Sequence, residues 1–80
     1  MTNQELSLKI LELVGGKENV TAVTNCMTRL RVTVKDLSKV ADAADWKAEG
    51  AMGLIKKDNG IQAVYGPKAD VLKSDINDIL

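Results

Sequence analysis

The clearest constraint on the fold is the strict alternation of side chains over residues 29–35. Leucine and valine occupy every second position, and arginine, threonine and lysine lie between them. Successive side chains of a β-strand point to opposite faces of its sheet, so this pattern predicts a strand with one buried and one polar face. The preceding segment, 19–25, is rich in β-branched residues and predicts a second strand. Only Cys26, Met27 and Thr28 connect the two segments, which predicts a β-hairpin.

A second hairpin is predicted in the C-terminal half of the chain. Segments 51–57 and 61–65 have the length and composition of strands, and Asp58, Asn59 and Gly60 separate them. Asn-Gly is typical of a type I′ turn, whose two central residues both have positive φ. We therefore expect Asn59 and Gly60 to form the turn.

One helix is expected before each of these hairpins. Thr2 and Glu5 have the spacing of a capping box at the start of an amphipathic segment, 2–14. Ser38 is the expected N-cap of a second helix that continues to a stop at Gly50.

A third helix is predicted to begin at Gly66-Pro67, because proline is well tolerated at the first helical position. Trp46, in the second helix, is expected to be a partly buried anchor. The element order is α-β-β-α-β-β-α. It predicts an α+β fold, with a four-stranded antiparallel sheet and three helices packed on one face. We expect residues 1–80 to form a single domain.

Charge and cysteine content exclude several classes of protein. Eleven acidic and eleven basic residues cancel, whereas nucleic-acid binders carry a basic excess, so we expect no nucleic-acid partner. One cysteine and no histidine exclude an internal disulfide, and we expect neither a metal site nor a cofactor. No apolar run is long enough to predict a membrane span.

The chemistry of the chain is concentrated around its single cysteine. Arg29 and Arg31 are the only arginines and lie within five residues of Cys26. Two residues apart on a strand, both point to the same face. A nearby cation favours the reactive thiolate, and guanidinium groups bind oxyanions through paired hydrogen bonds. The Thr28 hydroxyl and loop N–H groups such as that of Met27 could also donate to an anion. The residues alone predict an anion-binding loop with a reactive thiol.

A structural interpretation of the same residues stays open at this point. A lone cysteine in a small domain is often a buried, inert side chain. Two arginines on a strand often form only a solvated face. Met27 is a candidate apolar contact for a partner, although packing of its side chain against the loop is the favoured interpretation.

The segment from Asn19 resembles a known family signature. It reads Asn-Val, a spacer of five residues, Cys26-Met27-Thr28-Arg29, alternating aliphatic positions and Asp36. This is similar to the phosphorylation-site motif of enzyme IIB domains in bacterial sugar phosphotransferase systems (PTS), glucose/glucoside class. The resemblance extends over essentially the whole chain and includes segments 14–19 and 59–67.

The resemblance implies a role for each residue of the motif. Cys26 corresponds to the cysteine that is transiently phosphorylated. Arg29 and Arg31 correspond to arginines that bind the phosphoryl group or guide its transfer. Thr28 corresponds to the motif threonine, a phosphate or loop contact. Met27 occupies a variable position, so only its backbone is expected to contact phosphate.

The resemblance also implies the partners. The domain would be a phosphotransferase that accepts a phosphoryl group from a phosphohistidine on enzyme IIA. It would pass the group to a sugar bound by the membrane enzyme IIC domain. We expect a monomeric, soluble domain on the cytoplasmic side of the bacterial cell membrane, cut from a longer EIIBC or EIIBCA polypeptide.

Two other functions compete with this hypothesis. A small α+β domain could bind RNA or a phosphorylated ligand on its open sheet, although aromatic residues for base stacking are lacking. A lone exposed thiol could instead be a redox sensor, although the chain has no second cysteine to resolve an oxidised form.

Overall fold

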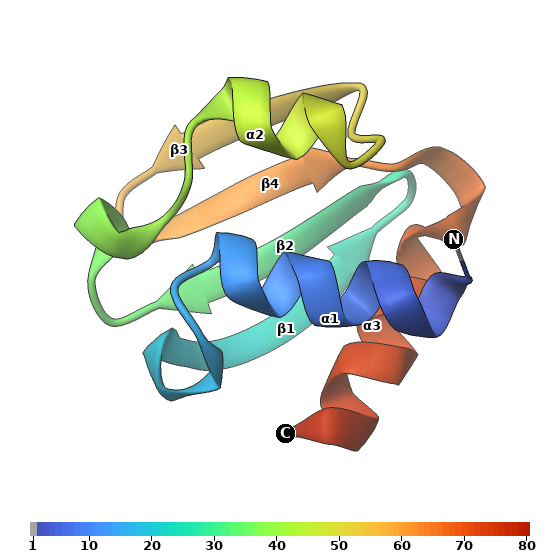
Figure 1. Cartoon of the computed structure of the whole chain (residues 1–80), viewed down its shortest axis with the longest axis horizontal. Helices are drawn as coiled ribbons and strands as arrows, with labels where there is room; N and C mark the ends of the chain where they lie inside the picture. Colours follow the sequence, from blue (N-terminus) through green and yellow to red (C-terminus); the bar gives the residue numbers. More distant parts are fainter. Residues whose placement is uncertain (1) are drawn as a thin grey trace.

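A four-stranded antiparallel sheet with three helices on one side forms the molecule (Figure 1). This computed structural model describes residues 2–80. The predicted fold class and element order are confirmed. The sheet has the order β1-β2-β4-β3, so the inner strands of the two hairpins pair with each other. The main elements are α1 (Asn3–Leu13), β1 (Val20–Cys26), β2 (Arg29–Val34), α2 (Ala43–Ala48), β3 (Gly53–Lys57), β4 (Gly60–Val64) and α3 (Ala69–Ile79).

The first helix begins with the predicted capping box. The Glu5 amide donates to Thr2 Oγ1 over 3.1 Å, and the Thr2 amide donates to Glu5 Oε1 over 2.8 Å. The hydrogen bond from the Thr2 amide to the ionised carboxylate lowers the pKa of Glu5.

The core lies between the sheet and the helices. The alternating aliphatic residues of β2 are buried, and its arginines lie on the opposite, open face, as the pattern predicts. None of the helices formed by residues 2–80 combines the length and apolarity needed to cross a membrane. The core residues are Leu6, Ile10, Leu11, Val14, Val23, Leu30, Val32, Val34, Val40, Trp46, Ala51, Ile61, Ala63, Tyr65, Ala69, Leu72 and Ile76.

Asn19 joins three segments at the start of the first hairpin. Its buried side chain donates to the carbonyl of Val14 over 2.7 Å and to that of Asp36 over 3.0 Å. Its Oδ1 accepts the Asp36 N–H over 2.9 Å. Asn19 precedes β1, whereas Cys26 ends that strand. This residue of the sequence motif therefore has a structural role, at the end of the hairpin opposite the thiol.

The predicted second helix is wrong at its start. A separate 3₁₀ turn covers Leu37–Lys39, and its N-cap is Asp36 rather than Ser38. The Asp36 carboxylate accepts both the N–H and the hydroxyl of Ser38, which lowers its pKa. Val40 then has extended geometry, and the Ala41 N–H donates to Leu13 O over 2.7 Å. These contacts end the 3₁₀ turn before α2 begins.

The predicted turn of the second hairpin is displaced by one residue. Asp58 and Asn59 form the loop, and Gly60 belongs to β4, where it pairs with Lys57 and Thr33. Only the first loop residue, Asp58, has positive φ (55°), so the turn is not type I′. A Cβ on Gly60 would lie 2.8 Å from the Val32 carbonyl oxygen. Gly60 is therefore needed for close strand pairing rather than for the turn itself.

Two further features differ from the prediction. Trp46 is fully buried, with 0% exposure, rather than partly buried. The last helix begins with a 3₁₀ turn, Gly66–Lys68, before α3. Gly66 is the first residue of that turn and Pro67 the second, one position later than predicted.

Candidate functional site

The β1–β2 turn presents the thiol at one end of the sheet. Cys26 is the last residue of β1, is exposed, and pairs with Arg29, the first residue of β2. Met27 and Thr28 form a two-residue loop between them. The short loop follows from this pairing, and it leaves the thiol at the tip of the hairpin, outside the core.

The backbone of this turn is held firmly. Met27 has a left-handed φ of 54°, a conformation that is uncommon for residues other than glycine. The Thr28 carbonyl accepts the N–H groups of both Tyr65 and Gly66, each over 3.1 Å. The segment between β4 and α3 therefore fixes the turn that follows Cys26.

The turn also leaves donors free. The N–H groups of Met27 and Thr28 donate to no residue in the described range, 2–80. Unused backbone N–H groups in a turn can bind an anion. Met27 and Thr28 thus offer donors directly after the thiol, which is where the prediction places phosphate contacts.

The two arginines share the open face of the sheet with Cys26. Arg29 pairs with Cys26, and Arg31 pairs with Thr24, two residues earlier on β1. Both arginine side chains are exposed, and neither forms an ion pair with a residue of the described chain. The structure therefore brings Cys26, Arg29 and Arg31 to one side of one hairpin.

Gln62 is a site neighbour that the sequence reasoning did not identify. It lies on β4 opposite Arg31, and its Oε1 accepts a hydrogen bond from Arg29 Nη1 over 3.1 Å. The signal was present, because Gln62 is the polar residue between buried Ile61 and Ala63 in a period-two strand. Strand order, which brings β4 beside β2, could not be read from that pattern.

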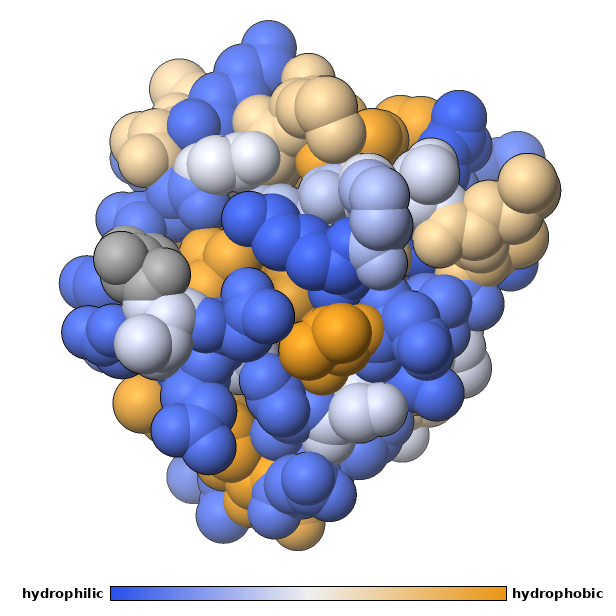
Figure 2. Space-filling model, turned by 90° about the vertical axis from the view of Figure 1, so that its right-hand side faces the viewer, coloured by the Kyte–Doolittle hydropathy of each residue, from blue (hydrophilic) through white to orange (hydrophobic). Residues whose placement is uncertain are grey.

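Met27 does not pack against its loop, so the favoured interpretation of this side chain is wrong. It is 87% exposed, and Met52, which directly precedes β3, is also exposed. Figure 2 shows the side of the molecule toward which the β1–β2 turn points. Its surface is mostly hydrophilic, with hydrophobic side chains in separate patches. A partner could therefore contact Met27 without first displacing it from the domain.

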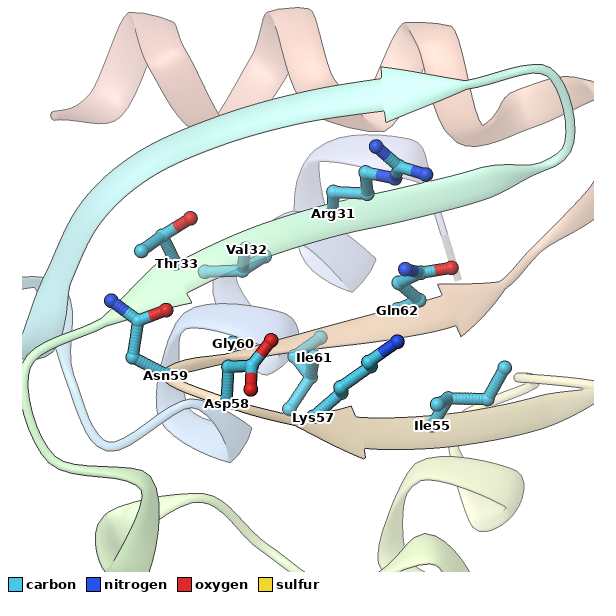
Figure 3. A pocket seen from close by; sticks show the side chains of 10 residues that line it. All are labelled: Arg31, Val32, Thr33, Ile55, Lys57, Asp58, Asn59, Gly60, Ile61 and Gln62. Carbon is cyan, nitrogen blue, oxygen red and sulfur yellow. The ribbon is translucent and has the colours of Figure 1, made fainter.

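An open hollow of about 300 Å³ lies on the same sheet face, toward the β3–β4 turn (Figure 3). Arg31 and Gln62 border it on the side nearer to Cys26. It is lined by Arg31, Val32, Thr33, Ile55, Lys57, Asp58, Asn59, Gly60, Ile61 and Gln62. Among residues 2–80, no three His, Cys, Asp or Glu side chains are grouped to hold a metal ion.

Tyr65 connects the site to the core. Its side chain is 3% exposed, and its Oη has no hydrogen-bond partner within residues 2–80. Burial, together with the negative charge of Glu49, raises the pKa of Tyr65 to about 12. The Tyr65 backbone N–H at the same time holds the Thr28 carbonyl.

Fold and site together define a class: a small antiparallel α+β domain that carries an exposed thiol beside two arginines on a hairpin. Residues 8–40, which include the site, match the family model of the phosphotransferase system, EIIB. The predicted family is confirmed, and the chain belongs to the EIIB family.

Curated relatives match nearly the whole chain. A PTS system glucose-specific EIICBA component of Streptococcus pneumoniae serotype 4 is 64% identical over 74 residues, 92% of this chain. A protein of the same name from Staphylococcus saprophyticus is 45% identical over 76 residues, 95% of this chain. The chain spans only 10% and 11% of the lengths of these two relatives.

A solved structure has the same fold. It is the crystal structure of one domain of the PTS system IIabc component from Clostridium difficile, with a TM-score of 0.80. The match covers 96% of this chain and 81% of that one at 24% identity. At this identity the likeness establishes the architecture and nothing further.

Proposed function

We propose that this chain is a phosphoryl carrier of a bacterial sugar phosphotransferase system, with Cys26 as the residue that carries the group. The observation that supports the proposal most directly is the exposed thiol on the same sheet face as Arg29 and Arg31. Membership of the EIIB family supplies the reaction class.

The first step is phosphoryl transfer from enzyme IIA. The Cys26 thiolate attacks phosphorus in line, a P–S bond forms, and the P–N bond to the partner's phosphohistidine breaks. The electron pair of that bond returns to the imidazole. A nucleophile at the tip of a hairpin suits this step, because the thiolate must reach phosphorus on the side opposite the departing imidazole.

The second step passes the group to the sugar held by enzyme IIC. A sugar hydroxyl attacks phosphorus, the P–S bond breaks, and the thiolate leaves on Cys26. The hydroxyl proton goes to a base beside the sugar. Cys26 is thereby returned to its starting state, so one domain can carry successive phosphoryl groups.

Electrostatic stabilisation is the contribution of this chain to both steps. The equatorial oxygens bear negative charge in the transition state, and positioned donors stabilise it. Arg29 and Arg31 would supply guanidinium donors, with the free N–H groups of Met27 and Thr28 on the side of the loop. The Thr28 hydroxyl, which is exposed, would be a further donor.

The proposal extends to partners and location. Enzyme IIA would dock over the exposed thiol, with Met27 as an apolar contact and the arginines facing acidic groups. Enzyme IIC would present glucose or a related sugar, since the two relatives are named glucose-specific. We propose a monomeric domain of a longer polypeptide that works at the cytoplasmic side of the membrane.

Intact-mass measurement tests the proposal. The chain is incubated with phosphoenolpyruvate and the general phosphotransferase proteins together with a IIA domain, and a gain of about 80 Da is expected, the mass of one phosphoryl group. Cys26→Ala should remove the gain completely. Lys57→Ala, which alters the corresponding position of the other hairpin, should retain it. A gain that persists in Cys26→Ala would refute the assignment, as would no gain in the wild type.

A further inference from the structure

Gln62 is the only residue within 2–80 that forms a side-chain hydrogen bond with an arginine. We propose that Gln62 is a positioning residue that holds Arg29 ready for phosphoryl transfer. This inference rests on the proposed function and assigns a role to a residue outside the cysteine motif.

Strand register places Gln62 between the two arginines. It lies directly opposite Arg31, and Arg29 pairs with Val64, so Gln62 is the diagonal neighbour of Arg29 on the open face. Diagonal neighbours across an antiparallel pair lie roughly 7–8 Å apart, within reach of long side chains. The 3.1 Å contact between Arg29 Nη1 and Gln62 Oε1 spans this diagonal.

The chemistry of the two groups fixes the orientation of the amide. A guanidinium has only donors, so Gln62 must present its oxygen to Arg29. In Figure 3 this oxygen is turned toward the β1–β2 turn, and the amide nitrogen is turned toward the hollow. The contact therefore holds the Arg29 guanidinium on the open face of the sheet, the face on which Cys26 also lies.

A neutral acceptor suits a residue that must later bind phosphate. Arg29 is exposed and forms no ion pair with the described residues, so Gln62 is its one side-chain restraint there. The amide oxygen takes one of the five guanidinium N–H groups and leaves the others for phosphoryl oxygens. It does so without neutralising the positive charge, whereas a carboxylate at this position would compete with phosphate for the guanidinium.

The test is a double-mutant cycle on single-turnover transfer from phosphorylated IIA to Cys26. Gln62→Met keeps the length of the side chain and removes the acceptor, so transfer should slow roughly tenfold, the effect of one lost hydrogen bond. Because Gln62 acts through Arg29, the variant carrying both Gln62→Met and Arg29→Ala should be no slower than Arg29→Ala alone.

A second measurement reports the contact without activity. In NMR spectra of the Arg29 side chain, rotation of the guanidinium should be faster in Gln62→Met than in the wild type. It should be slower in Gln62→Glu, whose carboxylate binds the guanidinium more strongly, while transfer in Gln62→Glu is still reduced. A merely structural residue would not separate mobility from rate in this way.

The outcomes distinguish the two proposals. A wild-type chain that takes no phosphoryl group overturns the proposed function and this role with it. A wild type that is phosphorylated, with Gln62→Met transferring at the same rate, overturns only the role of Gln62. Effects of Gln62→Met and Arg29→Ala that multiply in the double variant would also overturn it.

Discussion

The two hairpin turns have the same backbone design at opposite ends of the sheet. Each loop has two residues, and the first has a left-handed φ: 54° at Met27 and 55° at Asp58. The carbonyl of the second residue accepts an N–H from a residue at the end of the neighbouring inner strand or directly after it. Tyr65 donates to Thr28, and Val34 donates to Asn59 over 2.8 Å.

The residues that flank the loops differ. Cys26 and Arg29 flank the first loop, whereas Lys57 and Gly60 flank the second. This turn geometry therefore pairs the strands at both ends of the sheet, whatever residues flank the loop. It does not by itself make a site. A site arises at the end where the flanking side chains are a nucleophile and a guanidinium.

The largest expected effect comes from Arg29→Ala in the site turn. Loss of a donor to the transferring phosphoryl group should slow single-turnover transfer by about 10²–10³. The side chain is exposed, so the free energy of unfolding should change by no more than about 0.5 kcal/mol.

Lys35→Ala is the matched control for charge. It removes an exposed cation that directly follows β2, outside the turn, and should leave the transfer rate near that of the wild type. Equal losses in the two variants would mean that general charge, rather than a positioned guanidinium, drives the reaction.

Alkaline pH should lower the unfolding free energy of the chain through Tyr65, which lies beside the site turn. The pKa of Tyr65 is raised from 10 to about 12 in the folded chain, so the folded state holds this proton more tightly than the unfolded state. The stabilisation is complete below pH 10 and is lost as the pH rises toward 12. About 2–3 kcal/mol of unfolding free energy should be lost over this interval.

Tyr65→Phe isolates this effect, because the lysines titrate in both proteins. Between pH 9 and pH 12, urea titrations should show that the variant loses about 2–3 kcal/mol less unfolding free energy than the wild type. At pH 7 the two proteins should differ by no more than about 1 kcal/mol, since the Tyr65 hydroxyl has no partner within residues 2–80 to lose. Parallel pH profiles for wild type and variant would contradict this explanation.

Gly60→Ala, in the strand that follows the other loop, is the counterpart of Arg29→Ala: it should lower the free energy of unfolding and leave phosphoryl transfer intact. The added Cβ would meet the Val32 carbonyl oxygen at 2.8 Å, so the strands must shift, at a cost of about 1–3 kcal/mol. Gly53→Ala is the control, because its Cβ would lie 3.8 Å from Val64, an ordinary contact. Thermal unfolding should separate the two variants. Folded Gly60→Ala should still be phosphorylated on Cys26, and loss of phosphorylation in a folded sample would contradict the separation of the two turns.

The same contrast shows how far the sequence predicts the structure. Alternation over 29–35 and the capping box at Thr2 are local, and the structure has both. The cluster of Cys26, Arg29 and Arg31 is also local, because a single hairpin brings the three residues together.

Most of what the sequence did not predict depends on contacts between distant segments. Ser38 is bound locally by Asp36, but the Ala41 N–H, which follows the 3₁₀ turn, donates to the distant Leu13 carbonyl. Gly60 looks like a turn residue, but its close approach to β2 places it in a strand. Gln62 becomes a neighbour of Arg29 only through the pairing of β2 with β4.

The smallest expected effect tests the shared backbone geometry of the turns. Glycine adopts a left-handed φ without steric cost, whereas other residues are strained there, asparagine and aspartate least. Met27→Gly should therefore stabilise the chain by up to about 1 kcal/mol, after allowance for the extra entropy of glycine in the unfolded state.

Asp58→Gly should stabilise the chain less, because aspartate already tolerates its φ of 55°. Met27 is 87% exposed, so its removal loses little packing. Urea unfolding of the two variants measures the difference. If Met27→Gly proves the less stable of the two, the strain at the site turn must be offset by contacts of the methionine side chain. The two turns would then differ in their loops as well as in their flanking residues.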